Sequence, residues 1–299
     1  MGDVCPAGGA RDWTGRSPRA AGGRACADSG RRSLFDGGDF KCRGSSALQR
    51  GRIQGIRARA SGEHFYQKDV DPKQLPGYVD SVSLRAKSAG KTVHYVVCNN
   101  KDALLYLANL GCIEINPWAS RISHPDKPDF MTLDLDPSAS NSFDDVIAVA
   151  QCAHRVLDGL QLKSYCKTSG KTGLHVLVPV AAKYTFAQVR RFAKLLTARI
   201  SADMPALATM QHRVVKRRGK VYLDYMRNAV GQASAAPYSL RPWPGATVST
   251  PLEWPEVKEG LRPQQFTIKD HFQTTQGQGR PAKANAQPRH RSGWRNPQP

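Results

Sequence analysis

Three acidic residues in apolar surroundings are the strongest candidates for chemistry in this 299-residue sequence. Asp134 and Asp136 flank Leu135 at the end of a predicted strand over residues 130–135. Residues two apart on a strand project to the same face, so both carboxylates point one way while Leu135 enters the core. Two adjacent carboxylates repel each other, and hard divalent cations such as Mg²⁺ or Mn²⁺ favour such oxygen ligands. The pair therefore predicts a metal site, against the alternative of two solvated acids at a strand end.

A third acid, Asp224, interrupts the apolar segment VYLDY at residues 221–225. A basic cluster precedes it: Arg213, Lys216, Arg217, Arg218 and Lys220. A lone buried aspartate is costly unless it is paired or bound to a metal. Taken alone, Asp224 favours a structural acid whose hydrogen bonds are satisfied. Beside a cation already held by Asp134 and Asp136, it becomes a candidate third ligand.

A glycine-containing turn, SGKTGLH, separates two predicted strands at residues 169–175. Its glycines let backbone N–H groups approach an anion, while Ser169 and Lys171 add a hydroxyl and a positive charge. His175 opens the following strand and could donate to a phosphate oxygen. The plainer interpretation is an ordinary hairpin with a surface lysine. A P-loop would need a glycine where this chain has Tyr165, which argues against a Walker-type ATPase.

These residues need a mixed α/β domain to position them, and the apolar periodicity predicts one over residues 61–270. Strands are predicted at residues 65–68, 92–98, 112–115, 130–135, 164–168, 174–180 and 220–225. Helices are predicted at residues 101–110, 142–159 and 185–202. Ser142 is a suitable N-cap for the second helix. Residues 237–254 are rich in proline and are predicted to be irregular.

The two ends of the chain differ from this domain. Residues 1–60 are rich in glycine and arginine and show no sustained periodicity, which predicts a disordered or non-native leader. Residues 271–299 are polar and basic, which predicts a disordered tail. The formal net charge is +20, and the two ends supply more than half of it. A basic surface attracts polyanions, so nucleic acid or nucleotide is the first partner to consider.

The seven cysteines show no CxxC or Cys/His pairing at zinc spacing. We expect free thiols and a reducing compartment. No apolar run approaches membrane-spanning length, and residues 1–30 lack the apolar core of a signal peptide. We therefore expect a soluble, cytoplasmic protein with no membrane partner.

The motifs DLDP, SGKTGLH and YLDY, in this order and at these spacings, resemble the three catalytic motifs of the archaeo-eukaryotic primase superfamily. More narrowly, the chain resembles the polymerase domain of bacterial DNA ligase D, which acts in non-homologous end joining. The supporting segments are FYQK at 65–68, EINPWASR at 114–121, Pro128-Asp129, and YMRNAVGQASAAPYSLRPWPGATVST at 225–250. The resemblance implies an α/β (α+β) fold with a primase-polymerase-like mixed sheet core and flanking helices.

The resemblance also implies roles for individual residues. Three would be the catalytic ligands of two Mn²⁺ or Mg²⁺ ions: Asp134, Asp136 and Asp224. Five would bind the triphosphate of an incoming NTP or dNTP or complete the nucleotide and metal site: Lys68, Ser169, Lys171, His175 and Arg241. The implied activity adds nucleotides, often ribonucleotides, to DNA ends or to gapped DNA with a 5′-phosphate. Ku and ligase or nuclease modules are implied partners.

The chain departs from the family pattern in three ways. Relatives usually carry more residues before the FYQK segment, so the N-terminal part of the domain is expected to be missing. Asn116 stands where many relatives have a nucleotide-contacting histidine, and Trp243 stands where a second arginine is common.

Two other functions compete with the polymerase hypothesis. A haloacid-dehalogenase-like phosphatase would use Asp134 as its nucleophile, because DxDxS runs from Asp134 to Ser138. A non-catalytic remnant of the domain would bind DNA ends without extending them.

Overall fold

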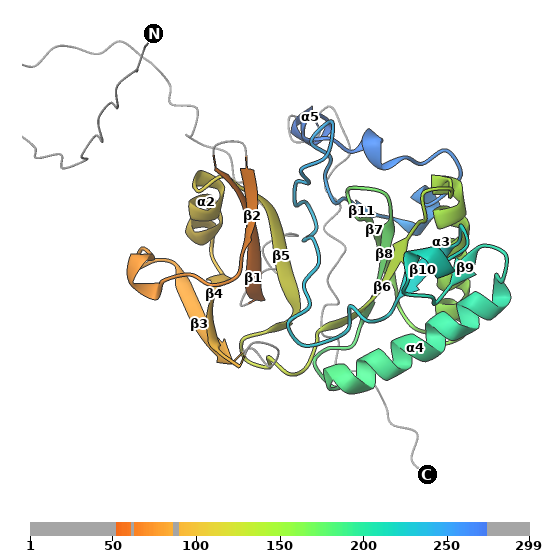
Figure 1. The fold of residues 1–299 in the computed structure, drawn as a ribbon, viewed down its shortest axis with the longest axis horizontal. Helices are drawn as coiled ribbons and strands as arrows, with labels where there is room; N and C mark the ends of the chain where they lie inside the picture. The colour runs from red at the N-terminus through yellow and green to blue at the C-terminus, as the bar shows by residue number, and fades with distance from the viewer. Residues whose placement is uncertain (1–51, 61–62, 86–89, 274–299) are drawn as a thin grey trace, which may run out of the picture. The chain divides into compact units, whose positions relative to one another are not determined.

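The computed structural model describes residues 52–60, 63–85 and 90–273, which all belong to one unit spanning residues 42–299 (Figure 1). The described strands form two sheets. In the first sheet the order is β2-β1-β4-β3, and β5 also pairs with β1. Its strands are β1 (Arg52–Ala60), β2 (Glu63–Gln67), β3 (Asp80–Arg85), β4 (Thr92–Cys98) and β5 (Cys112–Arg121). The helix α2 (Lys101–Asn109) packs on this sheet through Ala103 and Leu107.

The second sheet carries the three acids singled out above. Its strand order is β11-β7-β8-β6-β10-β9, antiparallel throughout except for the parallel pair β10–β9. The strands are β6 (Phe130–Asp136), β7 (Tyr165–Thr168), β8 (Leu174–Pro179), β9 (Ala208–Thr209), β10 (Val221–Asp224) and β11 (Pro251–Leu252). Neighbouring strands therefore come from widely separated parts of the chain.

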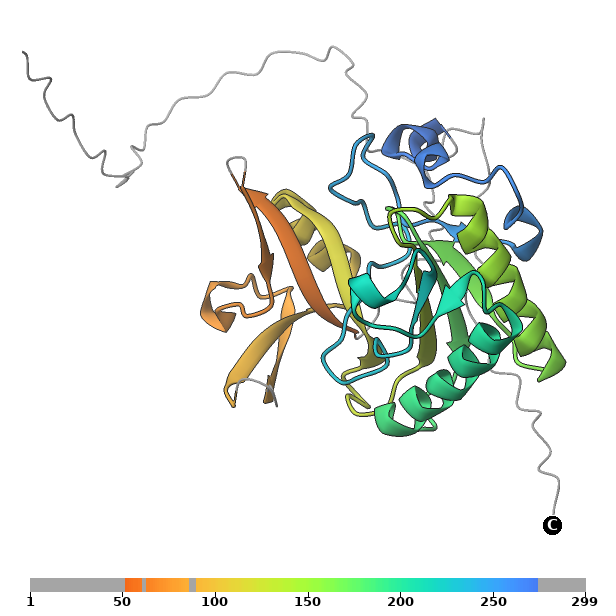
Figure 2. The same cartoon turned by 45° about the vertical axis from the view of Figure 1, so that its right-hand side comes forward.

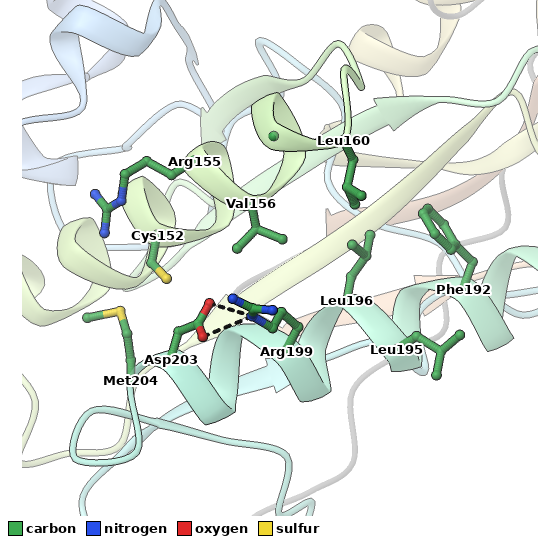
Figure 3. A pocket seen from close by; sticks show the side chains of 11 residues that line it. Cys152, Arg155, Val156, Leu160, Phe192, Leu195, Leu196, Arg199, Asp203 and Met204 are labelled. Carbon is green, nitrogen blue, oxygen red and sulfur yellow. Dashed lines mark hydrogen bonds and ion pairs between the residues drawn. The ribbon is translucent and has the colours of Figure 1, made fainter.

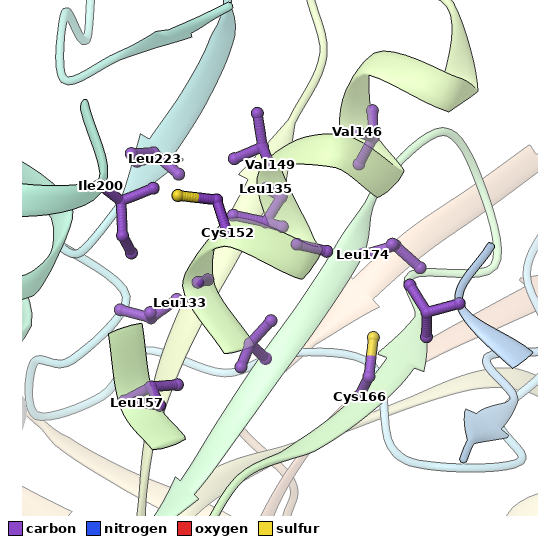
Figure 4. Packing of buried hydrophobic residues seen from close by; sticks show 14 of the residues in the cluster. Leu133, Leu135, Val146, Val149, Cys152, Leu157, Cys166, Leu174, Ile200 and Leu223 are labelled. Atoms are coloured by element: carbon purple, nitrogen blue, oxygen red, sulfur yellow. The ribbon is translucent and has the colours of Figure 1, made fainter. Parts of the chain in front are cut away.

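Two long helices, α3 (Phe143–Gly159) and α4 (Phe186–Asp203), pack side by side on the second sheet (Figure 2). Each begins with a capping box, at Ser142 and at Thr185, in which the cap hydroxyl accepts a hydrogen bond from the third helical N–H. Their apolar faces meet alternate residues of the strands, such as Leu133 and Leu135, in the main core (Figure 4). Alternation leaves the polar residues of the same strands on the other face.

The two sheets are joined through β5 and the loop after β10. Trp118 of β5 forms a bridge with Ala233, and the backbone N–H of Ile115 donates to the Ser239 hydroxyl over 2.9 Å. The backbone N–H of Ala236 also donates to the carbonyl of Ile115, at 2.9 Å. The proline-rich segment after β10 is largely irregular, as predicted. These hydrogen bonds attach it to the first sheet.

The fold confirms the predicted mixed α/β class and each predicted helix, with ends that differ by at most one residue. The domain boundary at residue 61 stays a prediction; β1 lies before it and pairs with β2, β4 and β5. Its pattern was missed because only residues 56–60 (IRARA) alternate, a signal too short to stand out from an arginine-rich background. The rest of the predicted leader, residues 1–51, lies outside the described residues, as do residues 274–299 of the predicted tail.

Several short elements were not predicted from the sequence: β3, β9, β11 and α5 (Ile268–Gln273). Two-residue strands such as β9 and β11 carry no periodicity, and their existence depends on the strand beside them. Four described cysteines, at positions 98, 112, 152 and 166, are free thiols, as expected. Within the described part of the chain, no helix has the length and apolar character needed to cross a membrane.

Candidate active site

Four polar side chains stand in register across the second sheet, on the face opposite the helices. Asp224 of β10 pairs with Asp134 of β6, Asp134 pairs with His175 of β8, and His175 pairs with Lys167 of β7. Directly opposite residues of neighbouring strands project to the same face. We call these four residues, Asp224, Asp134, His175 and Lys167, the polar row. Asp136 lies two residues beyond Asp134 and faces the same way.

The acids repel one another across this face. Asp134 is buried, and burial together with Asp224 and Asp136 raises its pKa to about 6, against the opposing effect of Arg227. A carboxyl group with a raised pKa is one whose charge is poorly compensated. The sequence prediction that Asp134 and Asp136 lie together, with Asp224 beside them, agrees with the strand register.

Two arginines neutralise these acids in the structure. Arg227 Nε lies 3.0 Å from Asp134 Oδ2 and 3.5 Å from Asp224 Oδ2. Arg217 Nη1 lies 2.9 Å from Asp136 Oδ2, and its guanidinium stacks 4.3 Å over the ring of Tyr222. In the described residues, no group of three or more His, Cys, Asp or Glu side chains is gathered closely enough to hold a metal ion. The three-carboxylate metal site therefore stays a prediction.

The arrangement of the acids nevertheless suits a bound divalent cation. Asp134 and Asp224 share one face, and both already contact the same cationic group, Arg227. Asp224 Oδ1 is further fixed by the backbone N–H of Met226, at 2.8 Å, and by the Tyr222 hydroxyl, at 3.3 Å. Carboxylate oxygens held in this way suit hard cations such as Mg²⁺ or Mn²⁺.

His175 links the acids to the glycine-containing turn. Its Nε2 lies 3.4 Å from Asp134 Oδ1, and its Nδ1 is buried with no hydrogen-bond partner in the described structure. Burial, with the nearby charges of Lys167, Arg227 and Arg241, holds the pKa of His175 well below its ordinary value. The imidazole is therefore neutral at physiological pH. Its Nε2 faces Asp134, and its Nδ1 can still form a hydrogen bond.

Lys167 places a positive charge at the end of the polar row. It is buried, and its Nζ donates to the Ser249 hydroxyl at 2.7 Å and lies 3.5 Å from the Thr168 carbonyl. Burial and the nearby Arg241 lower the pKa of Lys167 to about 7. The sequence analysis missed this residue, although a single charge within an otherwise uncharged strand is the same signal that identified Asp224.

The turn at residues 169–173 is more self-contained than predicted. The Ser169 hydroxyl accepts from the backbone N–H groups of Lys171, at 3.2 Å, and Gly173, at 3.1 Å. Two N–H groups expected to face an anion are therefore already used within the turn. Lys171 Nζ lies 5.9 Å from the ring centroid of Trp243.

Close packing explains both glycines of this turn. Gly170 has φ +74°, and a Cβ there would collide with the Arg241 side chain. A Cβ at Gly173 would collide with the carbonyl oxygen of Leu135, directly beside the acids. The turn is therefore fixed against β6 by backbone contact that only glycine permits.

The two remaining predicted site residues differ in their placement. Arg241 is partly buried beside the turn, and its Nη1 lies 3.4 Å from Glu114 Oε1 on β5. Asn116, which stands in place of a histidine, donates to the same Glu114 oxygen at 3.1 Å. Lys68 follows β2 and is exposed, and its predicted role stays a prediction.

A groove of about 690 Å³ lies elsewhere, between α3 and α4 (Figure 3). It is lined by apolar side chains that include the exposed Leu160 and Leu195, and by the ion pair between Arg199 and Asp203. The groove is on the helical side of the sheet. It does not belong to the candidate site, which is defined by the polar row and not by a hollow in the surface.

Comparisons with known proteins confirm the family resemblance. A sequence model of the family described as "LigD, primase-polymerase domain" matches residues 48–282. The chain is 32% identical over 221 residues to the bifunctional non-homologous end joining protein LigD of Bacillus subtilis, covering 73% of this chain and 35% of that protein. It is 30% identical over 191 residues to the multifunctional LigD of Pseudomonas aeruginosa, covering 64% of this chain and 22% of that protein.

The fold is similar to a solved structure described as the polymerase domain of Mycobacterium tuberculosis ligase D in complex with DNA. The TM-score is 0.71 at 22% identity, over 80% of this chain and 86% of that one. The chain thus spans about a third or less of the length of the two curated relatives, and most of the length of the isolated domain.

Proposed function

The chain belongs to the LigD primase-polymerase family, and on that premise we propose that it is a metal-dependent nucleotidyltransferase that extends DNA ends during break repair. The observation that carries the proposal is the pairing of Asp134 with Asp224 across β6 and β10, with His175 next in register. Asp134, Asp136 and Asp224 would hold two divalent ions, Mn²⁺ or Mg²⁺. When bound there, such ions activate a primer 3′-hydroxyl and stabilise charge on the leaving pyrophosphate.

The nucleotide would lie along the polar row toward the turn. His175 is neutral and has a single N–H, and its Nε2 faces Asp134 Oδ1. It would donate this N–H to a phosphate oxygen once metal ions occupy the Asp134 oxygens. Lys171 and Arg241 would supply positive charge near that position. The buried Lys167, whose pKa is lowered to about 7, would add a hydrogen-bond donor. The reaction joins the primer oxygen to the α-phosphate and breaks the bond to the β-phosphate, releasing pyrophosphate.

We propose DNA as the second substrate. Exposed cations lie between β9 and β10, in the segment that also supplies Arg217 to Asp136: Arg213, Lys216 and Arg218. Cations in this position can neutralise phosphates of a strand that approaches the acids. By resemblance, we extend the proposal to a cytoplasmic, nucleoid-associated setting with Ku and ligase or nuclease modules as partners.

Primer extension on 5′-phosphorylated gapped DNA with Mn²⁺ tests this function. We expect the full chain to add nucleotides, and we expect Asp134→Ala to abolish the addition because it removes a metal ligand. Asp158→Ala is the matched control, since Asp158 is an exposed acid on α3 that forms an ion pair with His154. Extension that survives Asp134→Ala would contradict the proposal.

The same experiment addresses the competing functions. Binding to gapped DNA without any metal-dependent extension would favour the non-catalytic remnant. The phosphatase hypothesis is not supported by the family assignment, because the matching family and relatives are primase-polymerase and end-joining proteins.

A further inference from the structure

Arg227 covers the paired acids on their solvent side. Its Nε contacts Oδ2 of both Asp134 and Asp224, at 3.0 and 3.5 Å. The Arg227 side chain is 43% exposed, whereas those of Asp134 and Asp224 are 13% and 16% exposed. Arg227 is therefore the most exposed of the three side chains.

The backbone around Arg227 holds the side chain in this place. Next to it, Asn228 is buried and makes a pair of hydrogen bonds with β6. Its Nδ2 donates to the Thr132 carbonyl at 2.7 Å, and its Oδ1 accepts from the Thr132 N–H at 2.8 Å. On the other side, the Met226 N–H donates to Asp224 Oδ1. Both neighbours of Arg227 are thus anchored to the strands that carry the acids.

The contact has an electrostatic reason. Asp134 and Asp224 are like charges directly opposite each other, an arrangement that destabilises an antiparallel pair unless a cation lies between them. Arg217, the other arginine that contacts these acids, forms its ion pair with Asp136. Arg227 is therefore the described arginine whose ion pairs join both members of the opposed pair.

We infer that Arg227 is a built-in counter-cation of Asp134 and Asp224, and that a divalent cation must displace it in order to bind both carboxylates. This inference rests on the proposed function, because it concerns the same acids. The guanidinium is on a long side chain that is 43% exposed, so it can swing into solvent once a divalent cation takes its oxygens. Arg227 thereby weakens metal binding and stabilises the metal-free protein.

Direct metal binding separates this role from catalysis. Free Mn²⁺ is measured by electron paramagnetic resonance during titration of the full chain, with no nucleotide or DNA present. We expect Arg227→Gln to bind Mn²⁺ at least about tenfold more tightly than the unaltered chain, because a charge-assisted contact with the acids is lost. Arg227→Met should do the same without offering an amide ligand, and Arg227→Lys should stay within about threefold of the unaltered chain.

Two controls make the outcomes distinct. Arg199→Gln removes a comparable arginine–aspartate pair on α4, with Nε 2.9 Å from Asp203, and should leave Mn²⁺ affinity unchanged. Asp134→Ala should abolish the tight site. In the metal-free state, Arg227→Gln and Arg227→Met should melt at a lower temperature than the unaltered chain.

Unchanged or weaker Mn²⁺ binding by both Arg227→Gln and Arg227→Met, with Asp134→Ala still abolishing it, would overturn the inference and leave the proposed function standing. Mn²⁺ binding that is insensitive to Asp134→Ala would overturn both.

Discussion

Asp134 and Asp224 lie directly opposite each other on the antiparallel strands β6 and β10, on the sheet face that the helices leave free. Nothing in the core requires acids at these positions, because the alternate residues Leu133, Leu135 and Leu223 already pack against the helices. A pair of opposed carboxylates lowers the stability of the fold unless a cation is bound between them.

Replacing Asp134 with asparagine should stabilise the metal-free protein above about pH 6. Burial, with Asp224 and Asp136, raises the pKa of Asp134 from 3.8 to about 6 despite Arg227. The folded state therefore keeps this proton up to a higher pH than the unfolded state does. The cost of the charge is absent below pH 3.8, grows as the pH rises, and is complete above about 6.

We expect the Asp134→Asn variant to have a free energy of unfolding about 3 kcal/mol higher than the unaltered chain near pH 8, and an equal one near pH 4. Urea unfolding with a chelator present measures both values. Asp158→Asn, at an exposed site, should change neither. A variant that is less stable than the unaltered chain near pH 8 would show that the charged Asp134 carboxylate does not lower the stability of the fold.

Replacing Lys167 with methionine should stabilise the protein at acid pH. Burial, followed by the charge of Arg241, lowers the pKa of Lys167 to about 7. Below that pH the ammonium is charged in both the folded and the unfolded state, and its burial penalty is fully present. As the pH rises from about 7 toward 10.5, the folded state sheds the proton first, so the stability of the unaltered chain rises.

The melting temperature of Lys167→Met should thus exceed that of the unaltered chain near pH 6, and the difference should shrink toward pH 10. Ser249 keeps a partner in the variant, because its hydroxyl also donates to the Thr168 carbonyl at 2.8 Å. A difference in melting temperature that stays constant between these two pH values would contradict the assignment of a lowered pKa.

The sequence predicts the acids, the long helices and the strands that carry them, because each has a local signal. Asp134 and Asp136 lie in a segment whose apolar and polar residues alternate as in a strand, and Ser142 stands at the N-cap position of a helix. Their roles stay proposals, but their positions follow from that pattern. Whether Asp224 lies opposite Asp134 depends on which strands pair. In the sequence, only the family resemblance indicated that these two residues lie together.

Other features had no local signal that could be interpreted. Arg227 lies in a short loop without periodicity, and its meaning depends on the register of β10 against β6. The burial of Arg241 against Glu114 depends on how β5 and the segment after β10 pack together. Contacts of this kind are set by tertiary structure, which local patterns do not encode.

Gly173→Ala should damage the site through the backbone. A methyl group there would collide with the Leu135 carbonyl, so the turn would have to move away from β6. We expect a loss of about 1–3 kcal/mol in the free energy of unfolding, together with weaker nucleotide binding, measured by denaturation and by titration. The control is Gly159→Ala, where a Cβ would meet nothing within 4 Å. Equal stability of the two variants would contradict the close contact between the turn and β6.

The rate of single nucleotide addition to gapped DNA with Mn²⁺, measured for Asp134→Asn, Asp224→Asn and the double variant, tests the central claim most directly. If the opposed carboxylates hold the same ions, each single change should lower the rate at least about 100-fold, and the double variant should be no slower than the slower single variant. An Asp224→Asn rate within about twofold of the unaltered chain, or losses that multiply in the double variant, would contradict it.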